Sequence, residues 1–181
     1  MMNQNAAVQE KISKQPSPFS PKIYQLYMPT QMQKRYLSFK LLFDTVLSAL
    51  ALFILSPLML VCIIAIKLDS KGPALFKQER IGKNGKKITV YKFRTMFLSS
   101  PSNIATAQLQ DAEKYITKVG KILRKTSIDE LPQLVNIIKG DMSIVGPRPL
   151  IIDEKNIHSM RYQRGVYFLK PGLAGLAQMN G

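Results

Sequence analysis

The longest apolar stretch of the chain runs from Val46 to Ile66 and contains no charged residue. As an α-helix, which rises about 1.5 Å per residue, it would just cross the roughly 30 Å hydrocarbon core of a bilayer. A helix that is apolar on every side could instead be buried in a globular protein, but a chain of 181 residues is too short to surround it. The pattern therefore predicts a membrane helix, which we place at residues 37–69.

A proline interrupts the middle of this stretch. Pro57 cannot donate a hydrogen bond to the carbonyl of Phe53, and its ring clashes with that turn, so a sharp bend is expected. The hydroxyl of Ser56 can bond a carbonyl that the proline leaves free. Basic residues flank both ends of the stretch and favour a cytoplasmic position for each end; they are Lys34, Arg35 and Lys40 before it and Lys67, Lys71 and Lys77 after it. These features suit a re-entrant helix, and on the residues alone a kinked single-pass helix remains open.

Residues 1–36 have the composition of a flexible basic tail. Asn, Gln and Ser are frequent, prolines interrupt any helix, and no apolar periodicity is present. Residues 70–181, which follow the membrane helix, would then form a cytoplasmic domain.

This domain begins with two strand-like segments, 74–81 and 87–96, which predict a β-hairpin. The pair Asn84-Gly85 between them suits a two-residue turn, because such a turn needs positive φ. A two-residue turn would pair Ile81 with Ile88 and Phe76 with Phe93.

Side-chain alternation along the second strand places Lys92 and Arg94 on one face. Two cations that project together could bind a phosphate. A solvated strand face explains the same pair without any ligand, and from this pattern alone it is the better interpretation.

Apolar residues recur at helical spacing from Asp111 to Lys125 and predict an amphipathic helix there. Four lysines would lie mainly on its exposed side: Lys114, Lys118, Lys121 and Lys125. Such a basic face could lie on anionic lipid headgroups.

Two acidic residues follow this helix within a cationic segment. Ser127, Asp129 and Glu130 match a capping box, with Ser127 as the N-cap of a helix that Gly140 can end. A helix cap alone explains both acids, since the helix dipole favours carboxylates in a first turn. Because Lys121, Arg124 and Lys125 directly precede the pair, a carboxylate here should stay ionised and could serve as a nucleophile or a Mg²⁺ ligand.

Pro147 and Pro149 bracket Arg148 and fix the backbone on both sides of it. A guanidinium presented from such a stiff loop costs little to order on an anion. An ordinary turn between two elements is the alternative.

The composition limits the classes of partner and of metal site. The net charge of +15 suits a protein that binds nucleic acid, anionic lipid or phosphorylated small molecules. The single cysteine, Cys62, excludes a disulfide framework within the chain and a Cys-based zinc site. The single histidine, His158, excludes a site with several histidines.

Taken in order, these motifs resemble those of the monotopic bacterial phosphoglycosyl transferases, also called the bacterial sugar transferase family. The resemblance covers about residues 34–181 and rests on Phe43-Asp44, Ser56-Pro57, Gly72-Pro73, the run from Tyr91 to Met96, the run from Thr126 to Leu134, the run from Lys139 to Ser143, the run from Val145 to Pro149, and Pro171-Gly172-Leu173 through Asn180-Gly181. So many separate motifs in one order make coincidence very improbable.

The resemblance implies an enzyme that transfers a sugar 1-phosphate from a UDP-sugar to undecaprenyl phosphate and releases UMP. It implies work at the cytoplasmic face of the bacterial inner membrane, in contact with membrane lipids, at the start of surface polysaccharide synthesis. By the same resemblance Asp129 is the nucleophile that carries the phosphosugar covalently, Mg²⁺ binds beside Asp129, and Glu130 assists with metal or proton handling. The bend at Ser56 and Pro57 corresponds to the re-entrant helix of the family.

Attack of a carboxylate on a diphosphate brings like charges together, so metal and cations must neutralise the phosphoryl oxygens. The candidates for binding the substrate phosphates are Lys92, Arg94, Arg124 and Arg148. The expected fold is α+β: a mainly helical small globular domain with a short β-hairpin, anchored by an N-terminal re-entrant membrane helix.

Family members usually continue past the Asn-Gly pair, whereas this sequence ends at Gly181. A catalytic domain truncated at its C-terminus is therefore expected, and a catalytically inactive, membrane-bound scaffold is the alternative function. A membrane-anchored nucleic-acid binder would also explain the charge, but no nucleic-acid motif or stacking platform of aromatic residues is recognised. The sequence determines neither the sugar that is transferred nor the oligomeric state.

Overall fold

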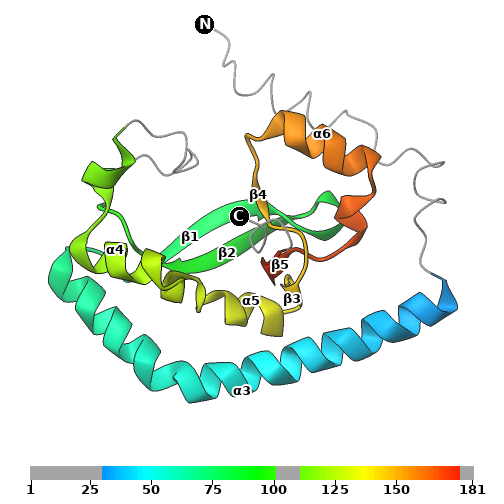
Figure 1. Cartoon of the computed structure of the whole chain (residues 1–181), viewed down its shortest axis with the longest axis horizontal. Helices are drawn as coiled ribbons and strands as arrows, with labels where there is room; N and C mark the ends of the chain where they lie inside the picture. Colours follow the sequence, from blue (N-terminus) through cyan, green and yellow to red (C-terminus); the bar gives the residue numbers. More distant parts are fainter. Residues whose placement is uncertain (1–29, 101–110, 176–181) are drawn as a thin grey trace, which may run out of the picture.

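One long helix, α3 (Gln31–Asp69), lies along one side of the molecule, and an α+β domain fills its concave side (Figure 1). The computed structural model describes residues 30–100 and 111–175. The remaining elements of the described part are β1 (Leu75–Ile81), the 3₁₀ turn η1 (Lys83–Gly85), β2 (Lys87–Phe93), η3 (Ala112–Tyr115), α4 (Lys118–Lys125), η4 (Ile128–Glu130), α5 (Gln133–Ile138), β3 (Ser143–Val145), β4 (Leu150–Ile151), α6 (Lys155–Gln163), η5 (Val166–Phe168) and β5 (Gly172–Ala174). The predicted α+β class with one long apolar N-terminal helix is confirmed.

Helix α3 begins at Gln31, where the sequence predicted the last part of a flexible tail. Thr30 caps the helix: its hydroxyl accepts a hydrogen bond from the Gln33 amide at 3.3 Å, and the Gln33 side chain accepts one from the Thr30 amide at 2.8 Å. This reciprocal pair satisfies two amides at the start of the helix. The rest of the predicted tail, residues 1–29, lies outside the described residues, whereas α3 ends at Asp69 as predicted.

Pro57 lies inside α3, and the helix changes direction along its length (Figure 1). The Ser56 hydroxyl donates a hydrogen bond of 2.7 Å to the carbonyl of Phe53. This carbonyl receives no helical hydrogen bond from Pro57, because proline has no N–H group. The predicted hydrogen bond from Ser56 to a carbonyl that the proline leaves free is therefore confirmed. The helix continues through the bend as one element.

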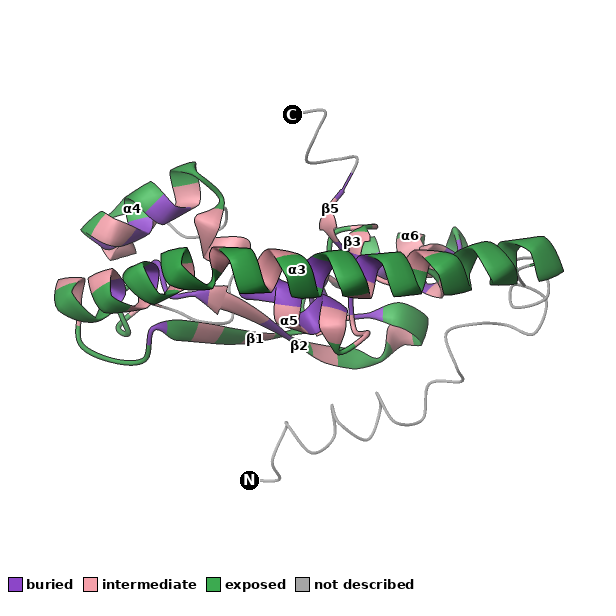
Figure 2. Cartoon of the chain, turned by 90° about the horizontal axis from the view of Figure 1, so that it is seen from below, coloured by how far each residue is buried: buried purple, intermediate pink, exposed green. Residues whose placement is uncertain are grey.

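Most of the α3 surface is exposed (Figure 2), including many of its large apolar side chains. Phe53, beside the bend, is 79% exposed. By length and composition α3 is the one helix of the described residues that could cross a membrane. Such an apolar surface is unusual for a soluble monomer and is typical of a helix in contact with lipid.

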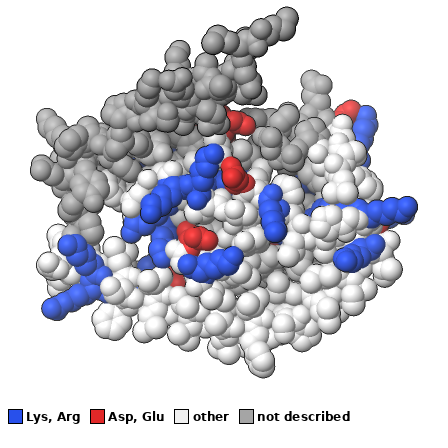
Figure 3. All heavy atoms as spheres, turned by 180° about the vertical axis from the view of Figure 1, so that it is seen from behind, with Lys and Arg blue, Asp and Glu red and all other residues white. Residues whose placement is uncertain are grey.

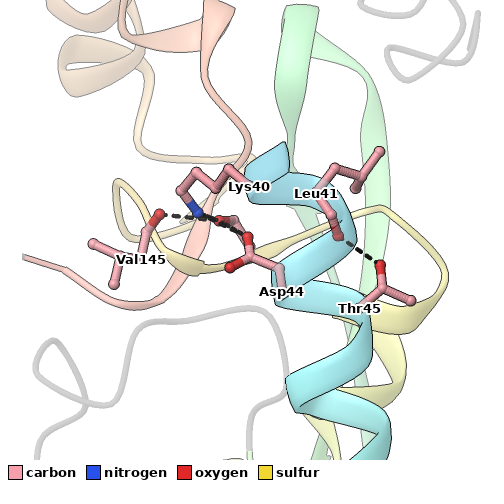
Figure 4. A network of polar contacts seen from close by, with 6 residues as sticks. Lys40, Leu41, Asp44, Thr45 and Val145 are labelled. Carbon is pink, nitrogen blue, oxygen red and sulfur yellow. Dashed lines mark hydrogen bonds and ion pairs between the residues drawn. The ribbon is translucent and has the colours of Figure 1, made fainter. Parts of the chain in front are cut away.

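The N-terminal arm of α3 is held to the domain by a buried polar cluster of Lys40, Asp44 and Ser143 (Figure 4). Asp44 is 5% exposed, and one of its carboxylate oxygens accepts hydrogen bonds from Lys40 Nζ at 2.7 Å and from Ser143 Oγ at 2.5 Å. Lys40 also contacts the Ser143 hydroxyl directly. The cluster joins α3 to β3.

The C-terminal arm of α3 is held to the same domain by apolar and polar contacts. Cys62 and Ile66 belong to a buried cluster with Phe93 and Leu123. The Asp69 carboxylate accepts a hydrogen bond of 3.0 Å from the amide of Val119 at the start of α4. Both arms of the apolar helix therefore contact one domain.

The central sheet has the order β2-β1-β4, so the predicted hairpin is confirmed and is extended by a third strand. A second, parallel pair of strands, β3 and β5, was not predicted. The predicted two-residue turn is wrong, because Arg80 pairs with Ile88 and Ile81 with Lys87. Five residues, 82–86, separate the two strands, and the Gly82 amide donates to the Lys86 carbonyl at 2.7 Å. This bond closes a loop of three residues, in which Asn84 and Gly85 do have the expected positive φ of 56° and 73°. A three-residue loop shifts the register by one residue and thereby reverses the face of each β1 side chain relative to β2.

The predicted amphipathic helix is shorter than expected: α4 begins at Lys118, and η3 precedes it. The four lysines of its basic face are exposed as predicted. Ile122, one of the apolar residues at helical spacing, is 63% exposed, because α4 buries Gly120 and Leu123 instead.

Asn136 from α5 joins that helix to the free edge of β2. Its side-chain amide donates to the carbonyl of Thr89 at 2.6 Å, and its side-chain carbonyl accepts from the amide of Tyr91 at 3.1 Å. Asn136 is fully buried, so these bonds replace those of a neighbouring strand.

We expect Asn136→Ala to lower the free energy of unfolding by about 2 kcal/mol, because the amide of Tyr91 and the carbonyl of Thr89 lose their hydrogen-bond partner. Denaturant unfolding of the chain in detergent micelles would measure the change. Lys121→Ala, at an exposed position of α4, serves as the control. An equal loss in both variants would contradict the role of Asn136.

Candidate active site

Asp129 and Glu130 lie in η4, a short 3₁₀ turn between α4 and α5. The predicted capping box is wrong: Ser127 adopts the left-handed conformation with a φ of 57°, and its side chain makes no capping hydrogen bond. The first regular α-helical residue after the pair is Gln133. Gly140 follows α5 with a φ of 83°, as predicted for a residue that ends a helix. The acidic pair is therefore held by a turn, and a cap does not account for it.

Glu130 is paired with Lys92 of β2. The distance from Lys92 Nζ to Glu130 Oε1 is 2.6 Å, and each side chain is about one fifth exposed. Among the residues that the structure describes, Asp129 has no ion pair of this kind. Two neighbouring carboxylates thus differ: Glu130 has a direct counter-ion, whereas Lys92 and Arg124 act on Asp129 without forming an ion pair with it in the described part of the chain.

Asp129 lies in a partly buried position among charges of both signs. Burial raises the pKa of its carboxyl group above the ordinary value, and the negative charge of Glu130 acts in the same direction. Lys92 and Arg124 oppose this rise, because their positive charges favour the ionised form. The sequence predicted the neighbouring cations, but it did not reveal that burial would outweigh them.

Arg124 enters from the last turn of α4 and lies beside Asp129. Its Nε donates a hydrogen bond of 2.8 Å to the hydroxyl of Thr95, which fixes the direction of the guanidinium. Burial lowers the pKa of Arg124, while Asp129 raises it. Arg124 therefore lies within electrostatic reach of Asp129, and its predicted contact with a substrate phosphate stays a prediction.

Arg94 has different partners, although the sequence grouped it with Lys92. Its two terminal nitrogens donate to the backbone carbonyls of Lys71 and Ser70, each at 2.7 Å, and only 4% of the residue is exposed. Gly72 makes this contact possible, since a Cβ there would lie 2.3 Å from the guanidinium. The structure thus assigns Arg94 to the end of α3 and leaves it little surface for a substrate.

A pocket opens beside the Lys92–Glu130 pair, and Arg148 lines it as well. Its other lining residues are Arg80, Val90, Gln133, Pro149, Gly172 and Leu173. Lys92, Glu130 and Arg148, all predicted from sequence, therefore meet at one site. Asp129 is not among the lining residues, but it directly precedes Glu130 and is acted on by the charges of Glu130 and Lys92, both of which line the pocket.

Arg80 of β1 is a site residue that the sequence did not identify. It shares a sheet face with Lys92, because Phe76 pairs with Lys92 and Arg80 lies four residues beyond Phe76 on β1. The predicted register had placed Arg80 on the opposite face. A three-residue loop ending in Asn-Gly was the signal that could have revealed it.

The residues at this site suit a Mg²⁺ ion bound partly by substrate. The described residues contain no group of three or more His, Cys, Asp or Glu side chains that could hold a metal alone. Mg²⁺ commonly uses one or two carboxylates together with substrate phosphates and water. Asp129, with no ion-pair partner within the described chain, could supply such a carboxylate.

The wider surface is strongly cationic, as the sequence predicts. On the face shown in Figure 3, Lys and Arg side chains cover more of the surface than Asp and Glu. A cationic surface raises the local concentration of phosphorylated ligands and of anionic lipid.

Comparison with known proteins agrees with the resemblance. A family model described as bacterial sugar transferase matches residues 35–181. The chain is 45% identical over 150 residues to the UDP-glucose:undecaprenyl-phosphate glucose-1-phosphate transferase of Klebsiella pneumoniae, over 79% of this chain and 31% of that protein. It is 46% identical over 145 residues to the exopolysaccharide production protein PSS of Rhizobium leguminosarum, over 77% of this chain and 72% of that protein.

A third relative acts, by its name, on a different sugar. The undecaprenyl-phosphate galactose phosphotransferase of Salmonella typhimurium is 41% identical over 181 residues, which cover 90% of this chain and 37% of that protein. The chain thus spans about a third of the length of the Klebsiella and Salmonella proteins.

Proposed function

The chain belongs to the bacterial sugar transferase family, and on this premise we propose that it transfers a sugar 1-phosphate from a UDP-sugar to undecaprenyl phosphate and releases UMP. The observation that carries the proposal is the position of Asp129, which lacks an ion-pair partner among the described residues and lies beside Lys92 and Arg124. A carboxylate without a direct counter-ion can attack phosphorus, and adjacent cations can neutralise the phosphoryl oxygens.

In the proposed first step an Asp129 oxygen attacks the phosphorus that bears the sugar. The bond from that phosphorus to the oxygen bridging the two phosphates breaks, and UMP leaves with the bonding electrons. In the second step an oxygen of undecaprenyl phosphate attacks the same phosphorus, and the Asp129 carboxylate is released. Each displacement needs its two reacting oxygens roughly in line.

Mg²⁺ held by Asp129 and the substrate phosphates would supply additional positive charge. Lys92 of β2 would pair with Glu130 and face the phosphoryl oxygens. Arg124 of α4, oriented by its hydrogen bond to Thr95, would also face the phosphoryl oxygens. Glu130 would orient Lys92 and could accept a proton from a metal-bound or free water. Chelation of divalent cations with EDTA is expected to stop UMP release, and added Mg²⁺ should restore it.

The assay that tests the proposal is UMP release by the purified chain with undecaprenyl phosphate, Mg²⁺ and each of several UDP-sugars. UDP-glucose and UDP-galactose are the first choices, because relatives carry the names of those sugars. One UDP-sugar should give UMP and a lipid-linked product in equal amounts. If every UDP-sugar tested leaves UMP at background level, the proposed reaction is wrong for this chain.

We further propose that α3 enters the cytoplasmic membrane as a re-entrant helix, with the domain on the cytoplasmic face. The contacts of both arms with one domain support this topology, because a single-pass helix would separate its two ends by the bilayer. The exposed apolar residues near the bend would then face lipid.

Labelling of single cysteines tests the topology. In a chain carrying Cys62→Ala, cysteines placed at Lys34 and Lys77 should both react with a membrane-impermeant maleimide in inverted vesicles, and neither should react in intact cells. Reaction of one position from the outer side of intact cells would establish a single-pass helix instead.

The charges around Asp129 also predict a pH dependence. Lys92 lowers the pKa of Asp129, so its removal in Lys92→Gln should raise that pKa further. A higher pKa leaves less of the nucleophile ionised at mildly acidic pH, and the acid limb of kcat/KM should therefore move to higher pH. Lys87→Gln, at an exposed position of the same strand, should leave the limb in place. A lower kcat/KM without any movement of the limb would contradict this electrostatic role.

A further inference from the structure

Two guanidinium groups, those of Arg80 and Arg148, line the pocket together with the Lys92–Glu130 pair. Arg80 comes from β1, and Arg148 comes from the loop between β3 and β4. Arg80 Nη1 donates a hydrogen bond of 3.0 Å to the carbonyl of Pro149, so β1 holds the loop that carries Arg148. Two cations from separate elements are thus brought to one cavity.

Arg80 retains hydrogen-bonding capacity toward this cavity. Its Nε and Nη2 donate to the side-chain oxygen of Gln78 at 3.1 and 2.5 Å, and Nη1 donates to Pro149. These contacts use three of the five N–H groups of a guanidinium. The other two have no acceptor in the part of the chain that the structure describes.

The two arginines repel one another. Burial and, to a smaller extent, the charge of Arg148 together lower the pKa of Arg80 to about 10, while Glu154 and Glu130 oppose the change. Within the described residues neither arginine has a carboxylate at ion-pair distance. Like charges that share a cavity without direct counter-ions favour a bound anion.

The position of this pair relative to Asp129 matters for the reaction. Glu130 acts electrostatically on both Asp129 and Arg80, and its ion pair with Lys92 lines the pocket that the two arginines also line. The cations that act on Asp129 are Lys92 and Arg124, whereas Arg148 acts on Arg80. A diphosphate attacked by Asp129 at one phosphorus would extend its second phosphate away from the nucleophile, since the leaving oxygen lies in line with the attacking one.

We propose that Arg80 and Arg148 form a second anion subsite, which holds the phosphate of the nucleoside monophosphate that leaves during the first displacement. This assignment rests on the proposed function, because it presumes a nucleoside diphosphate-sugar as substrate. The pair stabilises the negative charge that develops on the leaving phosphate when its bond to the neighbouring phosphorus breaks. Arg80 is then a substrate ligand in addition to a support of the Pro149 loop.

Direct binding of UMP to the full chain in lipid nanodiscs, measured by isothermal titration calorimetry, tests the subsite without turnover. Arg80→Gln and Arg148→Gln should each raise the Kd for UMP by about ten-fold or more, as expected for loss of a charge-assisted hydrogen bond. Arg148 is exposed, so its substitution leaves folding intact and keeps the test decisive if Arg80→Gln is unstable. Lys87→Gln removes an exposed charge outside the pocket and should bind UMP as the unsubstituted chain does.

Arg161→Gln separates ligand binding from loop support. Arg161 donates a hydrogen bond of 2.6 Å to the carbonyl of Arg148 and is not among the pocket-lining residues, so it holds the same loop from outside. Arg161→Gln should weaken UMP binding less than Arg80→Gln does.

An equal loss in both variants, an unchanged Kd in Arg80→Gln, or no UMP binding by the unsubstituted chain would each overturn the subsite. If the chain releases UMP from a UDP-sugar while Arg80→Gln binds UMP normally, the subsite is wrong and the proposed function stands. If no UDP-sugar yields UMP, the proposed function itself fails.

Discussion

Asp129→Asn is expected to lower UMP release by about 10³-fold or more, because an amide oxygen cannot replace the attacking carboxylate. The substitution keeps the shape of the side chain and removes only its charge and nucleophilic oxygen. Binding of UMP and membrane attachment should be retained. The measurement is the initial rate of UMP release from the UDP-sugar that proves active, with the chain held in nanodiscs of constant lipid composition.

Glu130→Gln is the matched control, since the two acids are adjacent and differ in their partners. Glu130 is paired with Lys92, so its substitution should reduce the rate by disturbing that lysine and should leave a measurable reaction. Mass spectrometry of the chain quenched during turnover should detect the added sugar phosphate in Glu130→Gln and not in Asp129→Asn. Turnover by Asp129→Asn at the rate of the unsubstituted chain would show that a different group is the nucleophile. Absence of turnover in the unsubstituted chain would favour the alternative function, a catalytically inactive membrane-bound scaffold.

The stability of the same variant provides an independent check. Burial raises the folded-state pKa of Asp129 above its unfolded value. The contribution of such a group to stability is present at low pH and is lost as pH rises through the folded pKa, so ionised Asp129 destabilises the fold at neutral pH. Asp129→Asn should therefore be at least as stable as the unsubstituted chain at neutral pH. If removal of the Asp129 charge stabilises the protein and abolishes its activity, the charge is required for the reaction and not for folding.

Patterns local in sequence predicted the long helix, its bend and the hairpin. Pro57 and Ser56 determine the bend through covalent geometry and one hydrogen bond, and neither effect depends on tertiary contacts. The Asn84-Gly85 pair correctly indicated positive φ. The start of α3 differs from the prediction, because the prolines up to Pro29 are typical of a tail, whereas Thr30 and Gln33 form a capping box directly after them.

The error in the hairpin register explains the error in the site. A slip of one residue reverses the sheet face of each side chain on β1, so Arg80 was overlooked as a neighbour of Lys92. The alternation along β2 also grouped Arg94 with Lys92, although β2 ends at Phe93 and Arg94 turns toward the end of α3. Long-range contacts of this kind are not encoded in strand periodicity.

The acidic pair shows a different limit. Ser127, Asp129 and Glu130 match the capping-box pattern, but the two short turns around η4 leave no regular helix for Ser127 to cap. Burial of Asp129 depends on β2 and α4 lying on either side of η4, and no local pattern predicts that. The family resemblance names Asp129 as the expected nucleophile, and the structure shows that Lys92 and Arg124 are the cations that act on it.

The largest effect on stability is expected from Asp44→Ala. The substitution leaves Lys40, which lies at 2.7 Å from the carboxylate, without its counter-ion in a site where Asp44 itself is only 5% exposed. Removal of one partner from a buried pair usually costs 3–5 kcal/mol, and because the Lys40 side chain is partly exposed we expect about 3 kcal/mol. Denaturant unfolding in detergent micelles measures this change.

Asp111→Ala is the matched control, because Asp111 forms an ion pair with Lys114 in which both side chains are mostly exposed. That pair should contribute about 0–1 kcal/mol. The double variant Lys40→Met with Asp44→Leu should recover much of the lost stability, since no unpaired charge remains in the interface. Equal losses in Asp44→Ala and Asp111→Ala would show that the buried cluster does not hold α3.

The consequence of Asp44→Ala should extend to the pocket. Ser143, the third member of the cluster, begins β3, and the loop carrying Arg148 follows β3. Release of the N-terminal arm of α3 would free β3 on one side and loosen that loop, so UMP release should fall in parallel with stability. Loss of stability with an unchanged rate would mean that β5 alone, which pairs with β3, is sufficient to hold the loop in position.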